Sequence, residues 1–423
     1  MHCSGGIMID RPRIAAWCLV LAVSSSATLI LLFGMFGSHG NSLVTGCYFL
    51  LSIAGAALFG TTKGLRLGIA DVLLVGLTIC IAISFARNPV VANTRDIVLL
   101  VLTLAAFAAA RLLRAEAIPF IRQASFRYSV VVVAVGTMLD VPALLDINDK
   151  VGRPLVFGFE NAATAFSISL ALLVLGFITS GPVLRSLKGL LTTALISVST
   201  IVFAASMVRF TLLAILVVLA ICFVLSARDR WVCATLAVVI VVSMAIGLWT
   251  RPINAAIYTK FAIDEANVSS PDCRSVNMDN SLEIRKVLLR DAFHLLPRAG
   301  LTGLGLNSFG TLGCFKGYAP HNDLLQAILE FGWLGGACFL GLIALPLLLV
   351  VRASADADSR FVFLFNAFFI MLSMIYGRFS GDISLFSALG LATSLISAKA
   401  APSERGFSMQ SIEANPNPGR PPP

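Results

Sequence analysis

The sequence predicts an all-α, polytopic membrane protein with about twelve transmembrane helices and one large outer loop that contains short helices. The 423-residue chain is 58% hydrophobic and only 13% charged, with a mean hydropathy of +0.91. Soluble domains carry about 25% charged residues. Apolar stretches of about 20 residues, enough to cross a hydrocarbon core, recur along the chain. The alternating pattern of an outer-membrane barrel is absent.

Twelve apolar segments are long enough to serve as helical spans. The first follows a basic N-terminus, but it is longer than the apolar region of a signal peptide and further spans follow it, so it is counted as a span. The predicted spans are residues 14–36, 43–61, 67–85, 96–112, 128–146, 160–179, 190–208, 210–227, 231–249, 323–351, 361–379 and 383–398.

Basic residues are distributed unevenly between the two sides of these spans. With the N-terminus in the cytoplasm, 17 Lys and Arg residues fall on the cytoplasmic side and 6 in the short outer loops. The other 8 lie in residues 250–322 and are not counted, because long loops do not follow the rule. Both termini are therefore predicted to be cytoplasmic. The net charge of +9 reflects this topology, and no basic run interleaved with aromatic residues points to nucleic acid.

The predicted spans divide the chain into four parts. Residues 1–249 hold the first nine spans, residues 250–322 form the large outer loop, and residues 323–400 hold the last three spans. Residues 401–423, rich in Pro, Ser, Asn and Gly, are expected to form a disordered cytoplasmic tail. The sequence shows no internal repeat, so an inverted-repeat transporter receives no direct support.

The large loop contains an amphipathic segment, predicted as a helix from Asn280 to Pro297. Asn280 and Glu283 have the spacing of a capping box, and the proline is expected to end the helix. Arg285 falls in the apolar arc, where amphipathicity alone would place a leucine. It indicates either an ion pair with a carboxylate of a span or a site for an anionic ligand. The glycine-rich residues 300–309 that follow predict a tight turn, because they lack the context of a phosphate loop.

Several charges are expected at the outer ends of the spans. Arg209 is the only charge between residues 190 and 227, at or just inside a hairpin tip. Such a charge indicates a functional residue, or alternatively one that snorkels to the interface. Asp140 is expected on the same side, where it could orient an arginine. Arg378 and Asp382 flank the last outer turn and are expected to pair with each other.

His321 is one of four histidines and follows Pro320, just before the tenth predicted span. With Asn322 or Asp323 as the helix cap, its ring would lie at the positive end of the helix dipole, which disfavours the imidazolium. A neutral imidazole can act as a general base. The alternative is a histidine that caps the helix through a backbone hydrogen bond.

The outer side also contains two cysteines and several acidic residues. Cys273 and Cys314 are the two cysteines of the large loop. An oxidising compartment would permit a disulfide between them. No group of Asp and Asn residues has the spacing of metal ligands there, so we predict neither a metal nor a cofactor.

The chain resembles the O-antigen ligase and O-antigen polymerase superfamily of bacterial inner-membrane glycosyltransferases. The resemblance covers roughly residues 155–345. The motifs that carry it are His321-Asn322-x-x-Leu325 with Glu330-x-Gly332-x-x-Gly335, Arg285 with Pro297 and Gly303-x-Gly305 and Phe309, Ser206-x-x-Arg209, and Phe159-Glu160-Asn161.

The sequence departs from the family pattern at three places. Met207 and Val208 separate the serine and the arginine of the Ser-Arg element, and Glu160 stands where proline is usual. The spacing from Pro297 to Gly303 is longer than in the family pattern. The match to the family pattern is therefore firmer at His321 and Arg285 than at Arg209.

The resemblance implies an enzyme that moves a glycan from an undecaprenyl-pyrophosphate carrier to a sugar hydroxyl of an acceptor glycan or glycolipid. Its large loop would be periplasmic, and its partners would be these substrates and the lipid bilayer. Arg285 and Arg209 would bind the pyrophosphate, because a planar guanidinium binds phosphate oxygens in pairs. His321 would activate the acceptor hydroxyl. The supporting residues implied by the motifs are Asn322, Asn161 and Glu330.

Two questions of function stay open from the sequence. A ligase joins the glycan to a lipid A core sugar or another acceptor, whereas a polymerase joins repeat units to each other. A different class, a twelve-span transporter or flippase of lipid-linked glycan, is the second alternative. Transporters place charges near the bilayer midplane, whereas the charges here gather at the outer face, which favours the transferase.

Overall fold

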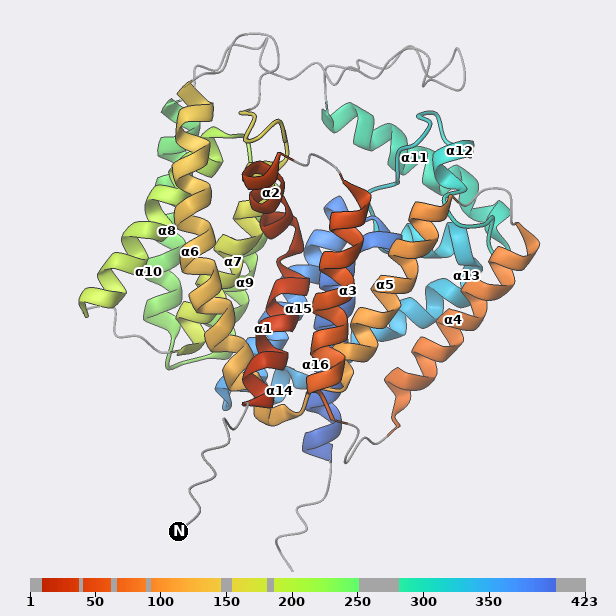
Figure 1. The fold of residues 1–423 in the computed structure, drawn as a ribbon, viewed down its shortest axis with the longest axis horizontal. Coiled ribbons are helices and arrows are strands. Elements are labelled where there is room, and N and C mark those ends of the chain that lie inside the picture. Colours follow the sequence, from red (N-terminus) through yellow and green to blue (C-terminus); the bar gives the residue numbers. More distant parts are fainter. Residues whose placement is uncertain are drawn as a thin grey trace, which may run out of the picture.

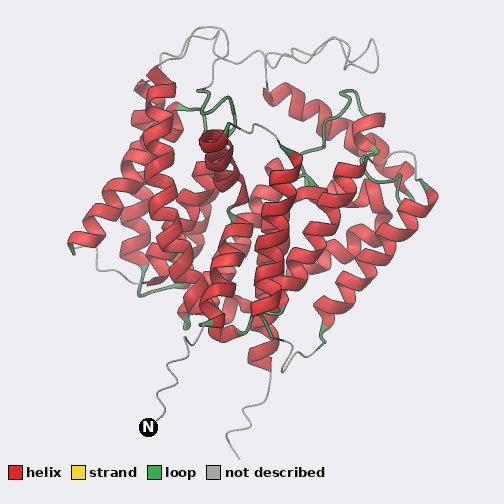
Figure 2. Ribbon diagram, viewed as in Figure 1, coloured by secondary structure: helices red, strands yellow, loops and turns green. Residues whose placement is uncertain are grey.

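The computed structural model describes residues 10–37, 41–61, 67–88, 93–145, 154–180, 186–250 and 281–400. Every regular element in these ranges is a helix (Figures 1 and 2). The elements are α1 (Arg11–Val23), α2 (Ser25–Phe36), α3 (Ser42–Phe59), α4 (Ile69–Arg87), α5 (Thr94–Arg111), η1 (Ala115–Ala117), α6 (Ile118–Leu145), α7 (Ala162–Ser180), α8 (Leu187–Ala205), α9 (Phe210–Leu225), α10 (Arg230–Thr250), α11 (Ser281–Ala299), α12 (Phe309–Leu312), α13 (Asp323–Ala344), η5 (Leu345–Leu349), α14 (Val350–Ala353), α15 (Ala357–Tyr376), η6 (Phe379–Gly381) and α16 (Ile383–Ala400).

The all-helical class predicted from the sequence is confirmed for the described ranges, and each predicted span contains a helix. Seven of these helices are long and apolar enough to cross a membrane, or eight if the bent pair α1 and α2 forms one span. The apolar helices α3, α9 and α16 are shorter. The count of about twelve spans therefore stays a prediction.

The first predicted span, residues 14–36, is wrong as a single helix. α1 and α2 meet at Ser24 with a bend of 81°. A run of three serines marks the bend, because serine side chains compete with the helix for backbone hydrogen bonds. The carbonyl of Ser24 accepts hydrogen bonds from the hydroxyls of Thr28 and Tyr128, both at 3.3 Å.

Helix α7 lies at the centre of the bundle, whereas α4 and α10 lie at its edge. Side chains along α7 are almost all buried, while most of α4 and α10 is exposed. The principal helix pairs are α5 with α16, α6 with α7, α8 with α10, and α4 with α13. The exposed apolar surface of α4 and α10 is the surface that a lipid environment would cover.

Helices α11 and α12 lie together across one end of the bundle, which we call the α11 face (Figure 1). α1 begins and α16 ends at the opposite end (Figure 1). α11 packs its apolar side against the first half of α13 through Ile284, Leu288 and Leu295. Pro297 does not end α11 as predicted, because the helix runs on to Ala299. Its last turn is tied down instead by the residues that follow, with Gly303 N donating to Ala299 O at 2.8 Å.

Helix α13 is broken at Gly332, whose φ of 81° is left-handed. In an unbroken helix Trp333 N would donate to Leu329 O. Residues 300–305 form hydrogen bonds with the backbone N–H and C=O groups that lose their helical partners at the break, because a buried backbone group without a partner is costly. The three bonds run from Trp333 N to Gly300 O (3.0 Å), from Leu304 N to Leu329 O (2.8 Å) and from Gly305 N to Glu330 O (3.2 Å).

We call this contact of residues 300–305 with the break in α13 the backbone clamp. Two glycines allow the two backbones to come this close. A Cβ on Gly332 would lie 2.2 Å from Leu301 O, and a Cβ on Gly303 would lie 2.1 Å from Glu330 O. Both glycines have positive φ, 81° and 79°. The atoms in the way belong to the backbone and cannot rotate aside, so no side chain fits at either position. The tight turn predicted for residues 300–309 is found here.

Replacing Gly332 with alanine should lower the free energy of unfolding by at least about 2 kcal/mol, because it adds a clash to a left-handed φ. The matched control is Gly46→Ala in α3, where a Cβ meets nothing within 4 Å. That change should stay within about 1 kcal/mol of the parent. Thermal unfolding of the detergent-purified proteins checks both. Equal midpoints for the two variants would contradict the clamp.

Candidate functional site

The candidate site lies at the α11 face, where three elements meet the segment before α13. These are the start of α9, the second turn of α11 and the end of α15.

Arg285 projects from α11 and contacts the rings of two aromatic residues. Its guanidinium carbon lies 4.6 Å from the ring centre of Phe210 and 5.3 Å from that of Tyr376. The two rings contact each other edge to face, with centres 6.0 Å apart. Arg285 forms no salt bridge with any described carboxylate, so the ion pair considered from the sequence is not found among the described residues. These cation–π contacts hold the guanidinium, and no described carboxylate pairs with its positive charge.

Arg209 lies directly before α9 and is half-buried. Its Nη2 contacts Met207 Sδ at 3.5 Å. Because the next residue is Phe210, the ring that stacks on Arg285 and the guanidinium of Arg209 come from adjacent positions. The start of α9 also turns its first backbone N–H groups toward this end of the helix, where anions bind favourably. The structure thus brings Arg209 and Arg285 to the same helix terminus.

The turn before α9 is held from α6. Asp140 is fully buried and accepts a hydrogen bond from Ser206 Oγ at 2.5 Å. Met207, the next residue, has a φ of 65°, a conformation that costs about 1–3 kcal/mol for a residue with a side chain. Asp140 was expected to orient an arginine directly, but it anchors the serine of the Ser-Arg element instead. The extra residues between Ser206 and Arg209 are accommodated by this strained turn.

His321 precedes α13 in a left-handed conformation, with a φ of 54°. Asn322 is the cap of α13, because its side chain accepts a hydrogen bond from Leu325 N at 3.0 Å. The capping role considered for the histidine therefore belongs to the asparagine. The imidazole is partly buried and makes no hydrogen bond to the described residues. A strained, non-capping histidine at this place is free to contact a ligand.

The electrostatics of His321 favour its neutral form. Burial lowers the pKa of the imidazole from its ordinary 6.5, and the positive charge of Arg285 lowers this pKa further. Both effects disfavour the imidazolium. The prediction of a neutral ring is supported, although the causes are desolvation and the neighbouring guanidinium, where the sequence pointed to the helix dipole. The effect of Arg285 also places the two residues close to each other.

Glu330 lies away from solvent, beside the clamp. Its carboxylate accepts a hydrogen bond from Gln326 Nε2 at 2.9 Å, and its carbonyl accepts one from Ser84 Oγ at 2.5 Å. Gln326 Oε1 accepts in turn from Phe379 N at 3.1 Å. These bonds join α4, α13 and η6. Glu330 therefore supports the broken helix, and no described hydrogen bond links it to His321.

Arg378 pairs with Asp96 of α5, Nη2 to Oδ1, at 2.7 Å. The expected pairing with Asp382 is wrong. Asp382 is partly buried, caps α16 by accepting from Leu385 N at 3.0 Å, and faces Asp323. The sequence could not reveal this, because Asp96 is far away in the chain and meets Arg378 only where α5 packs on η6.

Asn161 and the cysteine pair are not joined to the site. Asn161 is exposed just before α7, where its carbonyl accepts from Ala165 N at 3.0 Å. No described interaction connects its side chain to Arg285. Cys314 is disulfide-bonded. Its predicted partner, Cys273, lies outside the described residues, so the pairing itself stays a prediction.

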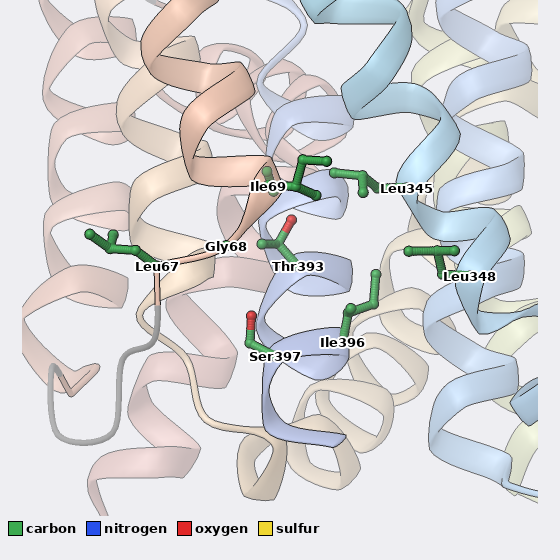
Figure 3. A pocket seen from close by; sticks show the side chains of 9 residues that line it. Leu67, Gly68, Ile69, Leu345, Leu348, Thr393, Ile396 and Ser397 are labelled. Carbon is green, nitrogen blue, oxygen red and sulfur yellow. The ribbon is translucent and has the colours of Figure 1, made fainter. Parts of the chain in front are cut away.

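A cavity of about 270 Å³ lies at the opposite end of the bundle (Figure 3). It lies between the start of α4, η5 and the end of α16, and its lining is mostly apolar. Because α4 crosses the bundle from this cavity to the α11 face, the cavity is separate from Arg285 and His321. Among the described residues, no three His, Cys, Asp or Glu side chains are grouped to hold a metal ion.

Comparison with known proteins identifies the class of this site. A protein-family model described as O-antigen ligase matches residues 192–340. The match runs from α8 through the second half of α13, so it includes Arg209, Arg285 and His321. It confirms the resemblance to the O-antigen ligase superfamily. No curated protein and no solved structure matched the chain.

Residues 192–340 are thus similar to O-antigen ligases, and the apolar helices of the chain are consistent with a membrane protein of that type. Sequence reasoning missed the two rings that contact Arg285, those of Phe210 and Tyr376, and the hydrogen bond between Ser206 and Asp140. The aromatic residues carried a weak signal, since each stands at the end of an apolar helix close to an arginine.

The lowered pKa of His321 predicts that its imidazole stays neutral, and reactive toward diethyl pyrocarbonate, at pH values below 6.5. Arg285→Gln removes one of the two causes, so the pKa should rise and the acid limb of modification should move to higher pH. Mass spectrometry of the modified peptide across pH measures both curves. Lys316→Gln, which removes an exposed charge elsewhere in the loop, is the control. Superimposed curves for Arg285→Gln and the parent would contradict the assigned cause.

Proposed function

We propose that the protein is a glycosyltransferase that moves a glycan from an undecaprenyl-pyrophosphate carrier to a sugar hydroxyl. The observation that carries the proposal is the grouping of three residues within the match to the O-antigen ligase model: Arg285, which pairs with no described carboxylate, the half-buried Arg209, and His321, whose pKa is lowered. Asn322 and Glu330 support this site through the cap and the break of α13.

In this proposal the two arginines bind the pyrophosphate of the donor. A diphosphate leaving group gains negative charge as its bond to the glycan breaks, and preorganised cations stabilise that charge. Contact with the rings of Phe210 and Tyr376 leaves the edge of the Arg285 guanidinium, with its N–H groups, available to phosphate oxygens. The N-terminus of α9 adds a favourable dipole.

His321 acts as the general base in this proposal. The neutral imidazole accepts the proton of the acceptor hydroxyl while that oxygen attacks the anomeric carbon, and the lipid pyrophosphate leaves. A base must be unprotonated to work, so the positive charge of Arg285 assists by keeping the ring neutral. The same arginine would thus stabilise the leaving group and tune the base. The proposal needs neither a metal nor a cofactor.

The proposal places the α11 face in the periplasm and both termini in the cytoplasm, in the bacterial inner membrane. The distribution of basic residues, 17 against 6 in the short loops, supports this orientation. The first described helix, α1, begins at the face opposite α11, and the last, α16, ends there (Figure 1). A lipid-linked donor would then reach the site from the periplasmic leaflet.

His321→Ala should lower the rate of glycan transfer by about 10²–10⁴-fold, the usual contribution of a general base. Arg285→Ala should lower it by about 10²-fold or more through lost charge stabilisation. Exposed residues of the same segment supply the controls, His294→Ala and Lys316→Ala, which should transfer at the parental rate. The assay is transfer from lipid-linked glycan in proteoliposomes without an ion gradient. Properly inserted His321→Ala and Arg285→Ala proteins that transfer normally would refute these roles.

The same assay separates the two classes of function considered from the sequence. A transferase makes a new glycosidic bond without a gradient, whereas a transporter or flippase only moves the lipid-linked glycan between leaflets. Transfer that fails in every gradient-free condition, with movement of the glycan intact, would favour the transporter.

Polymerase and ligase are distinguished by the surface glycan of a deletion strain. We expect a polymerase, so the long-chain ladder should disappear from a glycan gel while products with one repeat unit remain. Loss of all glycan attached to the acceptor, with long lipid-linked chains accumulating, would instead identify a ligase.

A further inference from the structure

We propose that α11 is an interfacial helix, and that its exposed side docks onto anionic phospholipid headgroups of the leaflet on the α11 face. This inference concerns the lipid bilayer itself, and it goes beyond the proposed transfer reaction. It starts from an exposed surface of α11 that the bundle leaves uncovered.

The exposed side of α11 carries an apolar stripe. Leu289 and Phe293 are 41% and 56% exposed, and they lie about 40° apart around the helix, one turn from each other. The stripe continues past the end of the helix in Leu301, which is 64% exposed. The opposite side of the same helix is already filled by its packing on α13 and α12. α11 is thus apolar on two sides, and only one has a partner among the described residues.

The stripe continues into a surface that the membrane must cover. Trp333 and Leu334 are 48% and 55% exposed, and Trp333 N donates to Gly300 O beside Leu301. From Trp333 to Ala353 the chain is helical for roughly 20 residues, the length that crosses a hydrocarbon core. Trp333 therefore lies at the end of a full crossing, the depth at which tryptophan is enriched.

A second span ends at the same level. Arg87, the last residue of α4, donates from Nη1 to Thr302 Oγ1 at 3.0 Å. α4 has 19 residues and is long and apolar enough to cross a membrane, so the arginine at its end marks the boundary between lipid tails and headgroups. Residues 300–302 join the end of α11 to this boundary, so the helix that lies across the α11 face ends at headgroup depth (Figure 1).

The charges beside the stripe fit an anionic surface. Lys286 and Arg290 are exposed beside the stripe, and Arg298 is exposed on the last turn of α11, about 140° around the helix from Phe293. The only acidic residue between positions 284 and 299 is Asp291, which accepts a hydrogen bond from Cys314 N at 2.9 Å and lies 3.8 Å from Arg290 Nη2. An apolar stripe flanked by cations is the pattern of a helix that lies in the membrane interface and binds anionic lipids.

Docking of this kind would also fix the position of Arg285 relative to the membrane. Arg285 lies on the same helix, one turn before Leu289. A helix held both by the bundle and by the headgroups presents that guanidinium at a fixed depth. The depth is the one at which a lipid-linked pyrophosphate would lie, so the docked helix and the proposed site would share one level.

The test is the fluorescence of a single added tryptophan in the full-length protein, reconstituted in phosphatidylcholine vesicles with and without phosphatidylglycerol. Phe293→Trp places an indole on the stripe. His294→Trp places one about 100° further around the same helix, away from the stripe, as the matched control. The difference from the parent protein isolates the new indole from Trp17, Trp231, Trp249 and Trp333.

Phosphatidylcholine brominated near the headgroup should remove most of the added fluorescence at position 293 and little of it at position 294. Iodide on both sides of the membrane should do the reverse. Quenching at position 293 by iodide but not by brominated lipid would overturn docking, because the stripe would face water. Protection from both quenchers would overturn it too, because another protein surface would then cover the stripe.

The charged part of the proposal is tested with the triple variant Lys286→Glu, Arg290→Glu and Arg298→Glu in the Phe293→Trp background. In the Phe293→Trp protein, phosphatidylglycerol should increase the quenching by brominated lipid. In the triple variant of that protein, phosphatidylglycerol should not change the quenching. Equal responses of the two backgrounds would refute recognition of anionic headgroups. The measurement uses no glycan, so its failure leaves the proposed transferase untouched, and a failed transfer assay leaves the docking result untouched.

Discussion

The backbone clamp between residues 300–305 and the break at Gly332 is the contact on which the α11 face depends. It satisfies backbone groups that a broken helix would otherwise leave without partners in an apolar setting, where each such group is expensive. It also fixes α11, which ends at Ala299, against the first half of α13, which starts just after His321. The positions of Arg285 and His321 therefore follow from one backbone contact. Two glycines permit it, because the carbonyls of Leu301 and Glu330 fill the space of any Cβ.

No described carboxylate pairs with the guanidinium of Arg285. A carboxylate beside Arg285 would neutralise the guanidinium before any ligand arrived, and a buried pair of that kind gains little stability. Phe210 and Tyr376 instead orient the guanidinium through their faces. The uncompensated charge has a second consequence, because it keeps the nearby imidazole neutral. Elsewhere the chain pairs its cations, as in the 2.9 Å contact of Arg360 with Asp229 on the opposite face.

Sequence reasoning succeeded where the signal is local. Apolar segments of membrane-crossing length gave every predicted span a helix, and the amphipathic pattern located α11. Asn322 as the cap and the turn at residues 300–309 also followed from neighbouring residues. Where partners are distant in the chain, the same reasoning failed. Arg378 pairs with Asp96, and Asp140 holds Ser206, because helix packing and not sequence distance decides which side chains meet. The bend at Ser24 depends in the same way on Tyr128 from α6.

The sequence by itself determined the all-helical class, the family resemblance and the choice of three candidate site residues. Hydrophobic length and residue type are properties of the chain that no packing arrangement changes. Only the tertiary structure decided that Arg285 stacks on aromatic rings without a carboxylate partner among the described residues, that Glu330 supports a broken helix, and that an apolar side of α11 stays exposed. Those outcomes depend on which surfaces the folded helices bury against each other, and a linear pattern does not contain that information.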